Sequence, residues 1–133
     1  MGQGTRAHAM ALFVILNSPM TMLPDSPSDY YREQECTDFL ATIPVEWDET
    51  RLLKGKIGKY TILARRAGDE WFIGAITDWD PRRFNLNSDF LNPGRYKVDI
   101  IVGTAIKPYI TKMIFTTPLK LQTEPTIIIA TYQ

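Results

Sequence analysis

The residue types that carry most protein chemistry are scarce in this sequence of 133 residues. It contains one histidine, His8, and one cysteine, Cys36. A zinc site of the usual kind needs three or four such ligands, and a Ser-His or Cys-His pair would have to use His8 itself. Because His8 lies in an apolar stretch, we interpret it as structural. We therefore predict no metal site and no nucleophile activated by a histidine.

Carboxylate pairs are the next candidates, since two nearby carboxyl groups can work as general acid and base. Glu33 and Glu35 fall in a predicted helix, where each residue advances by about 100°, so their side chains diverge. Asp48-Glu49 and Asp69-Glu70 fall in predicted loops, where such pairs are usually solvated. The segment GKIGKY has the wrong spacing for a phosphate-binding loop and precedes a strand. We predict no catalytic residue in this chain.

Three aromatic residues could form a platform on which a sugar ring stacks: Trp71, Trp79 and Tyr96. Aromatic side chains on the strands of a β-sandwich more often belong to the core, because they bury a large apolar area. The sequence leaves both interpretations open. Carbohydrate binding is therefore kept as the alternative to a structural role for these residues.

The strongest pattern that could position such residues is a β-hairpin. Residues 60–65 and 71–77 alternate in side-chain character around the polar, glycine-bearing loop Ala67-Gly68-Asp69-Glu70. Alternate residues of a strand point to opposite faces. Both faces of the second strand are apolar, so we expect it in the centre of the sheet, covered on both sides. Arg65 and Arg66 close the first strand, and we expect them at the rim.

Strand patterns continue after this hairpin. Alternation predicts strands near residues 84–87, 95–102, 109–115 and 126–132, separated by turn signals such as Asn92-Pro93-Gly94. Residues 44–54 are interpreted as a connector in which Trp47 packs against the sheet. The predicted fold is mainly β: an antiparallel β-sandwich of about 6–8 strands preceded by two α-helices.

The two helices are predicted over residues 5–16 and 27–42. Cys36, Phe39, Leu40 and Ile43 form the apolar stripe of the second helix. The first helix is apolar almost all round, which is typical of a helix buried in a larger structure, and nothing later in the chain is an obvious cover for it. Four of its residues are candidate contacts with such a structure or with a second copy: Met10, Phe13, Val14 and Leu16.

Composition limits the classes of partner. Fifteen basic and fifteen acidic residues give no net charge, and no basic patch indicates nucleic-acid binding. No apolar run approaches the ~20 residues of a membrane span. Arg6 followed by residues 9–16 resembles a short signal peptide, but the segment 17–20 lacks a small-x-small cleavage site, so we prefer a buried helix.

Two segments resemble the C-terminal part of glycoside hydrolase family 97. They are GTRAHAMALFVILNSPMTMLPDSP and FLATIPVEWDETRLLKGKIGKYTILARRAGDEWFIGAITDW. The order of WDET, ARRAGDEW, GAITDW and the later strand Tyr96–Ile100 follows the pattern of that family, and the resemblance covers about residues 4–102. After Val102 the sequence is shorter than the family pattern and differs from it, which leaves the last two strands the least defined.

The resemblance implies the following for this chain. Residues 1–43 would be the helical end of a (β/α)8 barrel, with the first helix as the last barrel helix, and residues 44–133 would be the C-terminal β-sandwich domain. Members of the family are α-glucosidases and α-galactosidases of Bacteroidetes such as Bacteroides, commonly periplasmic, and their catalytic and calcium-binding glutamates lie outside the matching region. We therefore expect no cofactor and no activity from this chain alone.

Three functions remain open at this stage. The first is a non-catalytic accessory domain for structure or oligomerisation in a family 97-like α-glycoside hydrolase, whose partners would be the rest of that enzyme or a second copy. The second is a carbohydrate-binding module. The third is an independent interaction protein that buries its first helix by dimerising.

Overall fold

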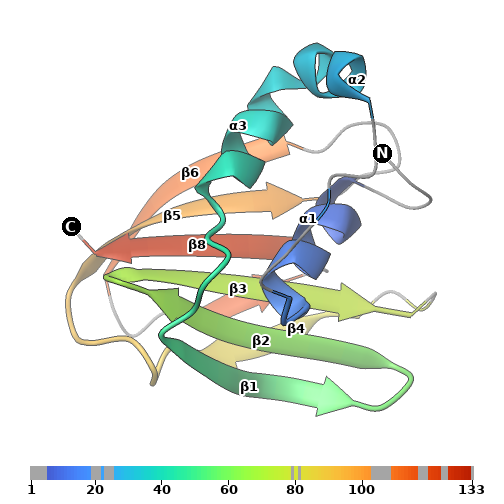
Figure 1. Cartoon of the computed structure of the whole chain (residues 1–133). Coiled ribbons are helices and arrows are strands. Elements are labelled where there is room, and N and C mark those ends of the chain that lie inside the picture. Colours follow the sequence, from blue (N-terminus) through green and yellow to red (C-terminus); the bar gives the residue numbers. More distant parts are fainter. Residues whose placement is uncertain are drawn as a thin grey trace.

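Two antiparallel sheets and three helices make up the part of the chain that the structure describes (Figure 1). The structure is a computed structural model, and it describes residues 6–18, 22, 26–78, 80, 82–102, 109–116, 120–123 and 126–132. The larger sheet has six strands in the order β1-β2-β3-β8-β5-β6, and the smaller sheet pairs β4 with β7. The predicted mainly β, sandwich-like fold is confirmed.

The strands follow one another with short connections. Their bounds are β1 Glu49–Lys56, β2 Tyr60–Ala67, β3 Glu70–Thr77, β4 Phe84–Asn87, β5 Arg95–Val102, β6 Tyr109–Thr116, β7 Lys120–Thr123 and β8 Thr126–Tyr132. The interpretation of residues 44–54 as a connector is wrong from Glu49 onward, because β1 begins there. β1 is an edge strand whose side chains are mostly exposed on both faces, so it lacks the apolar alternation that identifies a half-buried strand.

The predicted hairpin is confirmed as β2 and β3. Ala67 pairs with Glu70, so Gly68 and Asp69 form a two-residue turn. Gly68 has a φ of 59°, a conformation that glycine adopts without the steric cost of a Cβ atom. The register that this turn sets brings Ile62 opposite Ala75 and Ala64 opposite Ile73.

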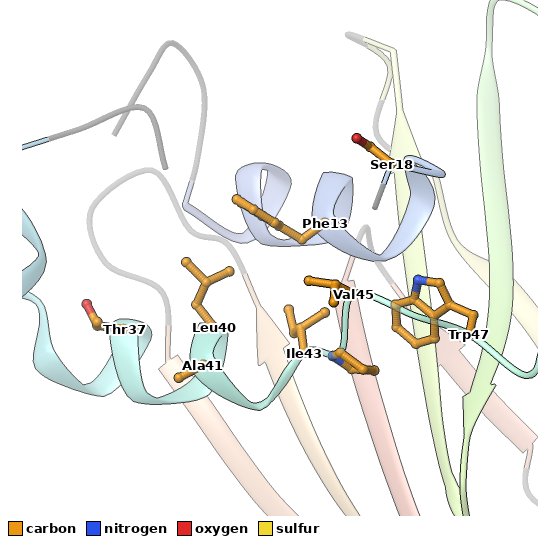
Figure 2. A pocket seen from close by; sticks show the side chains of 9 residues that line it. Phe13, Ser18, Thr37, Leu40, Ala41, Ile43, Val45 and Trp47 are labelled. Atoms are coloured by element: carbon orange, nitrogen blue, oxygen red, sulfur yellow. The ribbon is translucent and has the colours of Figure 1, made fainter. Parts of the chain in front are cut away.

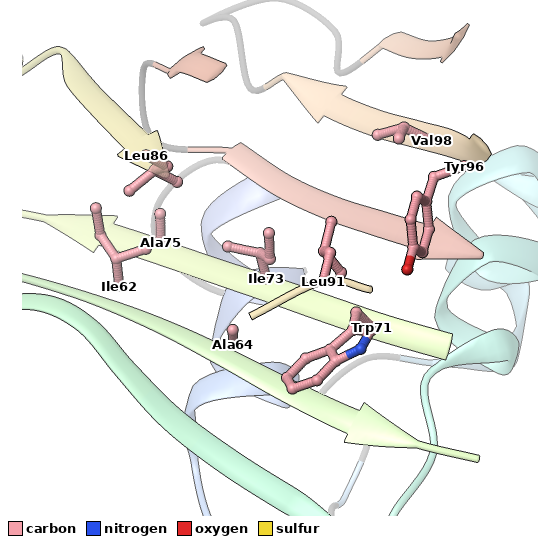
Figure 3. Close-up of a cluster of buried hydrophobic side chains, with 9 residues drawn as sticks. All are labelled: Ile62, Ala64, Trp71, Ile73, Ala75, Leu86, Leu91, Tyr96 and Val98. Atoms are coloured by element: carbon pink, nitrogen blue, oxygen red, sulfur yellow. The ribbon is translucent and has the colours of Figure 1, made fainter. Parts of the chain in front are cut away.

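β3 lies between two apolar layers, as its sequence predicts. One face of the sheet packs against β4 and the segment after it in a core that Figure 3 shows: Ile62, Ala64, Trp71, Ile73, Ala75, Leu86, Leu91, Tyr96 and Val98. The other face packs against the helices in a second core: Ala7, Met10, Ala11, Val14, Cys36, Phe39, Phe72 and Ile101. Successive residues of β3 therefore contribute to different cores.

The helices are α1 Arg6–Ile15, α2 Pro27–Arg32 and α3 Gln34–Thr42. The prediction of a single helix over residues 27–42 is wrong, because the backbone of Glu33 leaves the helical region, with φ −118° and ψ 51°. The Thr37 hydroxyl donates to the Tyr30 carbonyl at 2.9 Å and to the Glu33 carbonyl at 3.1 Å, so a side chain satisfies carbonyls at this break. The apolar stripe of the second half is confirmed, since Cys36 and Phe39 are buried.

α1 lies directly on the sheet. Met10 and Val14 have no exposed surface, and they pack with Phe72 and Ile101. The expectation that nothing in the chain covers this helix is thus wrong for its inner face. No helix among the described residues is long and apolar enough to cross a membrane.

Gly74 of β3 permits this close approach. A Cβ atom on Gly74 would lie 2.9 Å from the Val14 Cβ, 3.0 Å from the Ile15 Cγ1 and 3.1 Å from the Ala11 carbonyl oxygen. A Cβ atom essentially never lies closer than 3.0 Å to another atom, and the contacts at 3.0 and 3.1 Å are tighter than most, so Val14 would have to shift and the Ala11 backbone would have to give. The absence of a side chain at this position therefore sets the distance between helix and sheet.

Candidate interaction surface

An apolar groove of about 250 Å³ separates α1 from α3 on the helical side of the molecule. Figure 2 shows its walls: Phe13 comes from α1, Thr37, Leu40 and Ala41 come from α3, and Ile43, Val45 and Trp47 come from the connector. Val45 in this wall is about half exposed, at 55%, and Leu16, directly after α1, is exposed to the same degree, at 54%. An apolar groove with exposed apolar neighbours is a typical docking surface.

Trp47 forms the floor at one end of the groove, and the sheet holds it in place. Its ring meets Phe72 edge to face, with ring centroids 5.4 Å apart. The Arg65 guanidinium also lies over the Trp47 ring, 5.5 Å from its centroid. Contact with an aromatic ring and a cation fixes the indole orientation. The predicted packing of Trp47 against the sheet is confirmed.

Arg65 is a buried residue beside the groove floor whose position the sequence did not predict. It is only 4% exposed, so its expected place at the rim is wrong, whereas Arg66 is partly exposed. Its terminal nitrogens donate to the Leu16 and Ile15 carbonyls at 3.3 Å and 3.2 Å. A helix leaves its last carbonyls unpaired and negatively polarised, which explains a buried cation there. Burial lowers the pKa of Arg65 from its ordinary value.

Two exposed residues that follow groove-wall residues in the sequence are acidic. Asp38 on α3 and Glu46 on the connector are exposed, and each directly follows a residue of the groove wall, Thr37 and Val45. Asp38 accepts a hydrogen bond from the Gln34 amide at 2.6 Å. The groove is thus apolar inside, and we call the two exposed carboxylates next to its wall, Asp38 and Glu46, its acidic rim.

One of the carboxylate pairs considered for acid–base chemistry, Asp48-Glu49, is engaged in ion pairs with arginines. Glu49 contacts Arg51 at 2.5 Å and Arg66 at 3.5 Å, and Asp48 contacts Arg66 at 3.7 Å. The hydrogen bond from Arg51 is the main reason why the pKa of Glu49 is lowered. A carboxylate that stays ionised beside arginines is a poor general acid.

A second ionic cluster lies at the end of β3. Arg82 donates to both oxygens of the Asp78 carboxylate, and Lys59 lies 3.4 Å from it. The Arg82 guanidinium holds the pKa of Asp78 well below its usual range. Arg82 also lies over the Tyr60 ring, 5.7 Å from its centroid. This cluster joins the segment after β3 to the β1–β2 turn.

The structure buries two of the three residues predicted to contact sugar. Trp71 and Tyr96 belong to the core between the sheets, with 7% and 4% of their surface exposed, and the Tyr96 hydroxyl donates to the Asn92 carbonyl (Figure 3). Phe90 packs on Trp71, so neither predicted residue presents an open ring face. Trp79 lies outside the described residues. Carbohydrate binding therefore stays a prediction without a described site.

The candidate contacts on α1 divide into two pairs. Met10 and Val14 are buried against this chain's own sheet. Phe13 lines the groove and Leu16 is exposed, so these two remain available to a partner. His8 is exposed on α1.

Metal binding has no described site in this chain. Within the described ranges, no group of three or more His, Cys, Asp or Glu side chains could hold a metal ion. The expectation that the calcium ligands of the resembling enzymes lie outside this chain stays a prediction.

Sequence comparisons place most of the β domain in one family. Residues 46–124 match the family described as glycosyl-hydrolase 97 C-terminal, oligomerisation. A retaining alpha-galactosidase of Bacteroides thetaiotaomicron is 49% identical over 96 residues, which are 72% of this chain and 14% of that protein. A probable retaining alpha-galactosidase of Streptomyces bingchenggensis is 38% identical over 68 residues, 51% of this chain and 11% of that protein. The chain thus spans a small part of these relatives.

Solved structures share the whole described fold. A glycoside hydrolase family 97 enzyme from Pseudoalteromonas sp. strain K8, in complex with acarbose, superposes with a TM-score of 0.87 and 27% identity, over 98% of this chain and 23% of that chain. A beta-arabinopyranosidase superposes with a TM-score of 0.80 and 26% identity, over 96% of this chain and 21% of that chain. The helices and the sheets together therefore recur as one unit in longer proteins.

Proposed function

Because this chain belongs to the glycosyl-hydrolase 97 C-terminal, oligomerisation family, we propose that it is a non-catalytic domain that joins copies of a parent glycoside hydrolase. The family match over residues 46–124 carries this proposal. The groove between α1 and α3 supports it, since a solvent-exposed apolar groove favours association with another protein surface.

The parent enzyme that we propose is an α-glycoside hydrolase, and the 49% identical relative favours an α-galactosidase. An α-glucosidase remains the alternative. The substrate would be set elsewhere in the parent, since the same domain fold occurs in a beta-arabinopyranosidase. We propose no catalytic residue and no cofactor for this chain, since the adjacent carboxylates Asp48 and Glu49 are held in ion pairs with arginines.

Sedimentation equilibrium of the purified 133-residue chain tests the proposal. We expect self-association that increases with protein concentration. A chain that is folded and monomeric at every concentration would contradict an oligomerisation role. Hydrolysis of a chromogenic α-galactoside or α-glucoside by the same preparation would contradict the non-catalytic role.

A further inference from the structure

The turn between β1 and β2 carries an unusual residue. Ile57 is fully exposed at the tip of this turn, between Lys56 and Gly58, which has a φ of 72°. Turn positions favour Gly, Asn, Asp, Ser and Pro, whose backbone or side chain suits a tight turn. An isoleucine gains nothing from the turn geometry, and its exposed side chain costs solubility. An apolar knob at this tip is what a contact with another surface requires.

Charge is divided along the chain although the total is zero. Residues 27–49, which form α2, α3 and the connector, contain seven acidic residues and one basic residue, Arg32. Residues 50–66, which form β1, the turn and most of β2, contain six basic residues and no acidic residue. Some of these charges pair within the chain, as Glu49 does with Arg51. Lys56 at the tip, and Asp38 and Glu46 at the groove, are exposed.

These two surfaces complement each other in apolar character and in charge. The groove between α1 and α3 is apolar inside with an acidic rim, and the tip is an apolar knob beside a lysine. Complementary potentials steer two surfaces together and fix their register.

The tip cannot reach the groove of its own chain. β1 runs from the connector below α3 to the turn at the opposite end of the strand (Figure 1). A strand of eight residues spans roughly 25 Å. The complementary surfaces therefore serve two different copies.

We propose that the β1–β2 turn of one copy inserts Ile57 into the groove between α1 and α3 of a second copy, with Lys56 facing the acidic rim. This inference rests on the proposed oligomerisation function and names its contact. A stable interface usually buries about 1,200–2,000 Å² in total, more than one turn can cover. In a dimer with a two-fold axis the contact forms twice, because each copy contributes both its tip and its groove. The second contact adds the further buried area.

Charge exchange between the two surfaces tests the contact. Lys56→Glu and Glu46→Lys, each alone, are expected to weaken self-association of the 133-residue chain at least about tenfold, because like charges then face each other. An equimolar mixture of the two variants restores association, since each tip again meets a groove of opposite charge. The chain that carries both substitutions also associates with itself. Lys97→Glu, an exposed reversal on β5, is the matched control and leaves association unchanged.

The apolar knob is tested separately. Ile57→Ser is expected to weaken association about tenfold or more, because it removes the side chain at the centre of the contact. Met22→Ser removes another exposed apolar side chain, with 82% exposure, and serves as its control. Circular dichroism of each variant verifies the fold, which surface changes of this kind preserve.

The outcomes separate this inference from the proposed function. Self-association that none of Lys56→Glu, Glu46→Lys and Ile57→Ser weakens overturns the tip-in-groove contact and leaves oligomerisation standing; the groove would then receive another occupant, such as the rest of the parent enzyme. A strictly monomeric wild-type chain overturns both. Weakening by single reversals without recovery in the mixture also overturns the contact.

Discussion

The two sides of α1 differ in how closely they are packed. On the sheet side, Met10 and Val14 have no exposed surface, and Gly74 leaves no room for even a Cβ atom. On the α3 side, Phe13 faces a groove of about 250 Å³ with exposed Val45 in its wall. One helix thus has one side that is fully used by its own chain and another side that is not.

The difference shows how a single apolar helix can serve stability and binding at once. Adding or removing a methyl group in a close-packed interface lowers the free energy of unfolding, because the neighbouring side chains cannot rearrange freely. Side chains that line an open groove tolerate change, because solvent or a partner fills the space. Substitutions on the sheet side should therefore affect unfolding, whereas substitutions on the groove side should affect association.

Gly74→Val is expected to have one of the two largest effects, together with Met10→Ala. The new side chain would overlap the backbone of Ala11 and push α1 from the sheet, at a cost of about 3 kcal/mol in the free energy of unfolding. Urea denaturation measures this cost. Gly55→Val is the control on the exposed edge strand, where the nearest side chain is the flexible Leu52, and it should change stability by less than about 1 kcal/mol. Equal losses in both variants would mean that α1 is not tightly docked.

Met10→Ala and Phe13→Ala compare the two sides of the helix directly. Met10→Ala should cost about 2–5 kcal/mol, since it leaves a cavity in a fully buried position. Phe13→Ala should cost clearly less, because its ring borders the groove and no cavity is enclosed. Thermal unfolding of both variants at the same protein concentration shows which of the two loses more stability. A larger loss for Phe13→Ala would reverse the assignment of the two sides.

Arg65→Met tests how much the hydrogen bonds of Arg65 to the C-terminal end of α1 contribute to stability. The substitution removes both hydrogen bonds to the Ile15 and Leu16 carbonyls, and we expect a loss of about 1–3 kcal/mol. Arg66→Met is the matched control, since Arg66 makes surface ion pairs that contribute at most about 1 kcal/mol. The hydrogen-bond assignment fails if chemical denaturation gives the two variants the same midpoint.

The smallest expected effect is that of a substitution at Asp78, which belongs to the ionic cluster at the end of β3 and not to α1. Its pKa is lowered below the ordinary 3.8 mainly by the Arg82 hydrogen bond, so the ionised form favours the fold. This contribution is complete above the ordinary pKa and is lost as the pH falls below it toward the lowered value. Asp78→Asn should therefore be slightly less stable than the wild type at pH 7, and the difference should shrink below about pH 4. A constant difference from pH 7 to pH 2 would exclude the linkage.

The sequence predicts what depends on local pattern. Alternation and the Gly68 turn were sufficient to locate the β2–β3 hairpin and to place β3 between two apolar layers. The apolar stripe with Cys36 and Phe39 likewise follows from helical spacing alone. Each of these features is decided by residues within one or two elements.

Features that depend on distant partners escaped the sequence. Arg65 is charged, so its pattern indicates a rim position, yet the carbonyl end of α1 supplies a buried partner 50 residues away. β1 has no apolar face to mark it, and it forms because β2 offers it hydrogen bonds. The groove exists only because α1 and α3 lie beside each other on the sheet, an arrangement that neither helix encodes by itself.

The position of β8 has a consequence for how the chain is made. β8 follows every other strand in the sequence but lies in the middle of the large sheet, between β3 and β5. During synthesis, the β1–β2–β3 and β5–β6 groups emerge first and have no direct pairing to each other. Both groups keep an open edge until β8 leaves the ribosome and enters between them. The finished sheet is therefore a late, long-range event, and the open edges mark the stage at which chaperones would protect this chain.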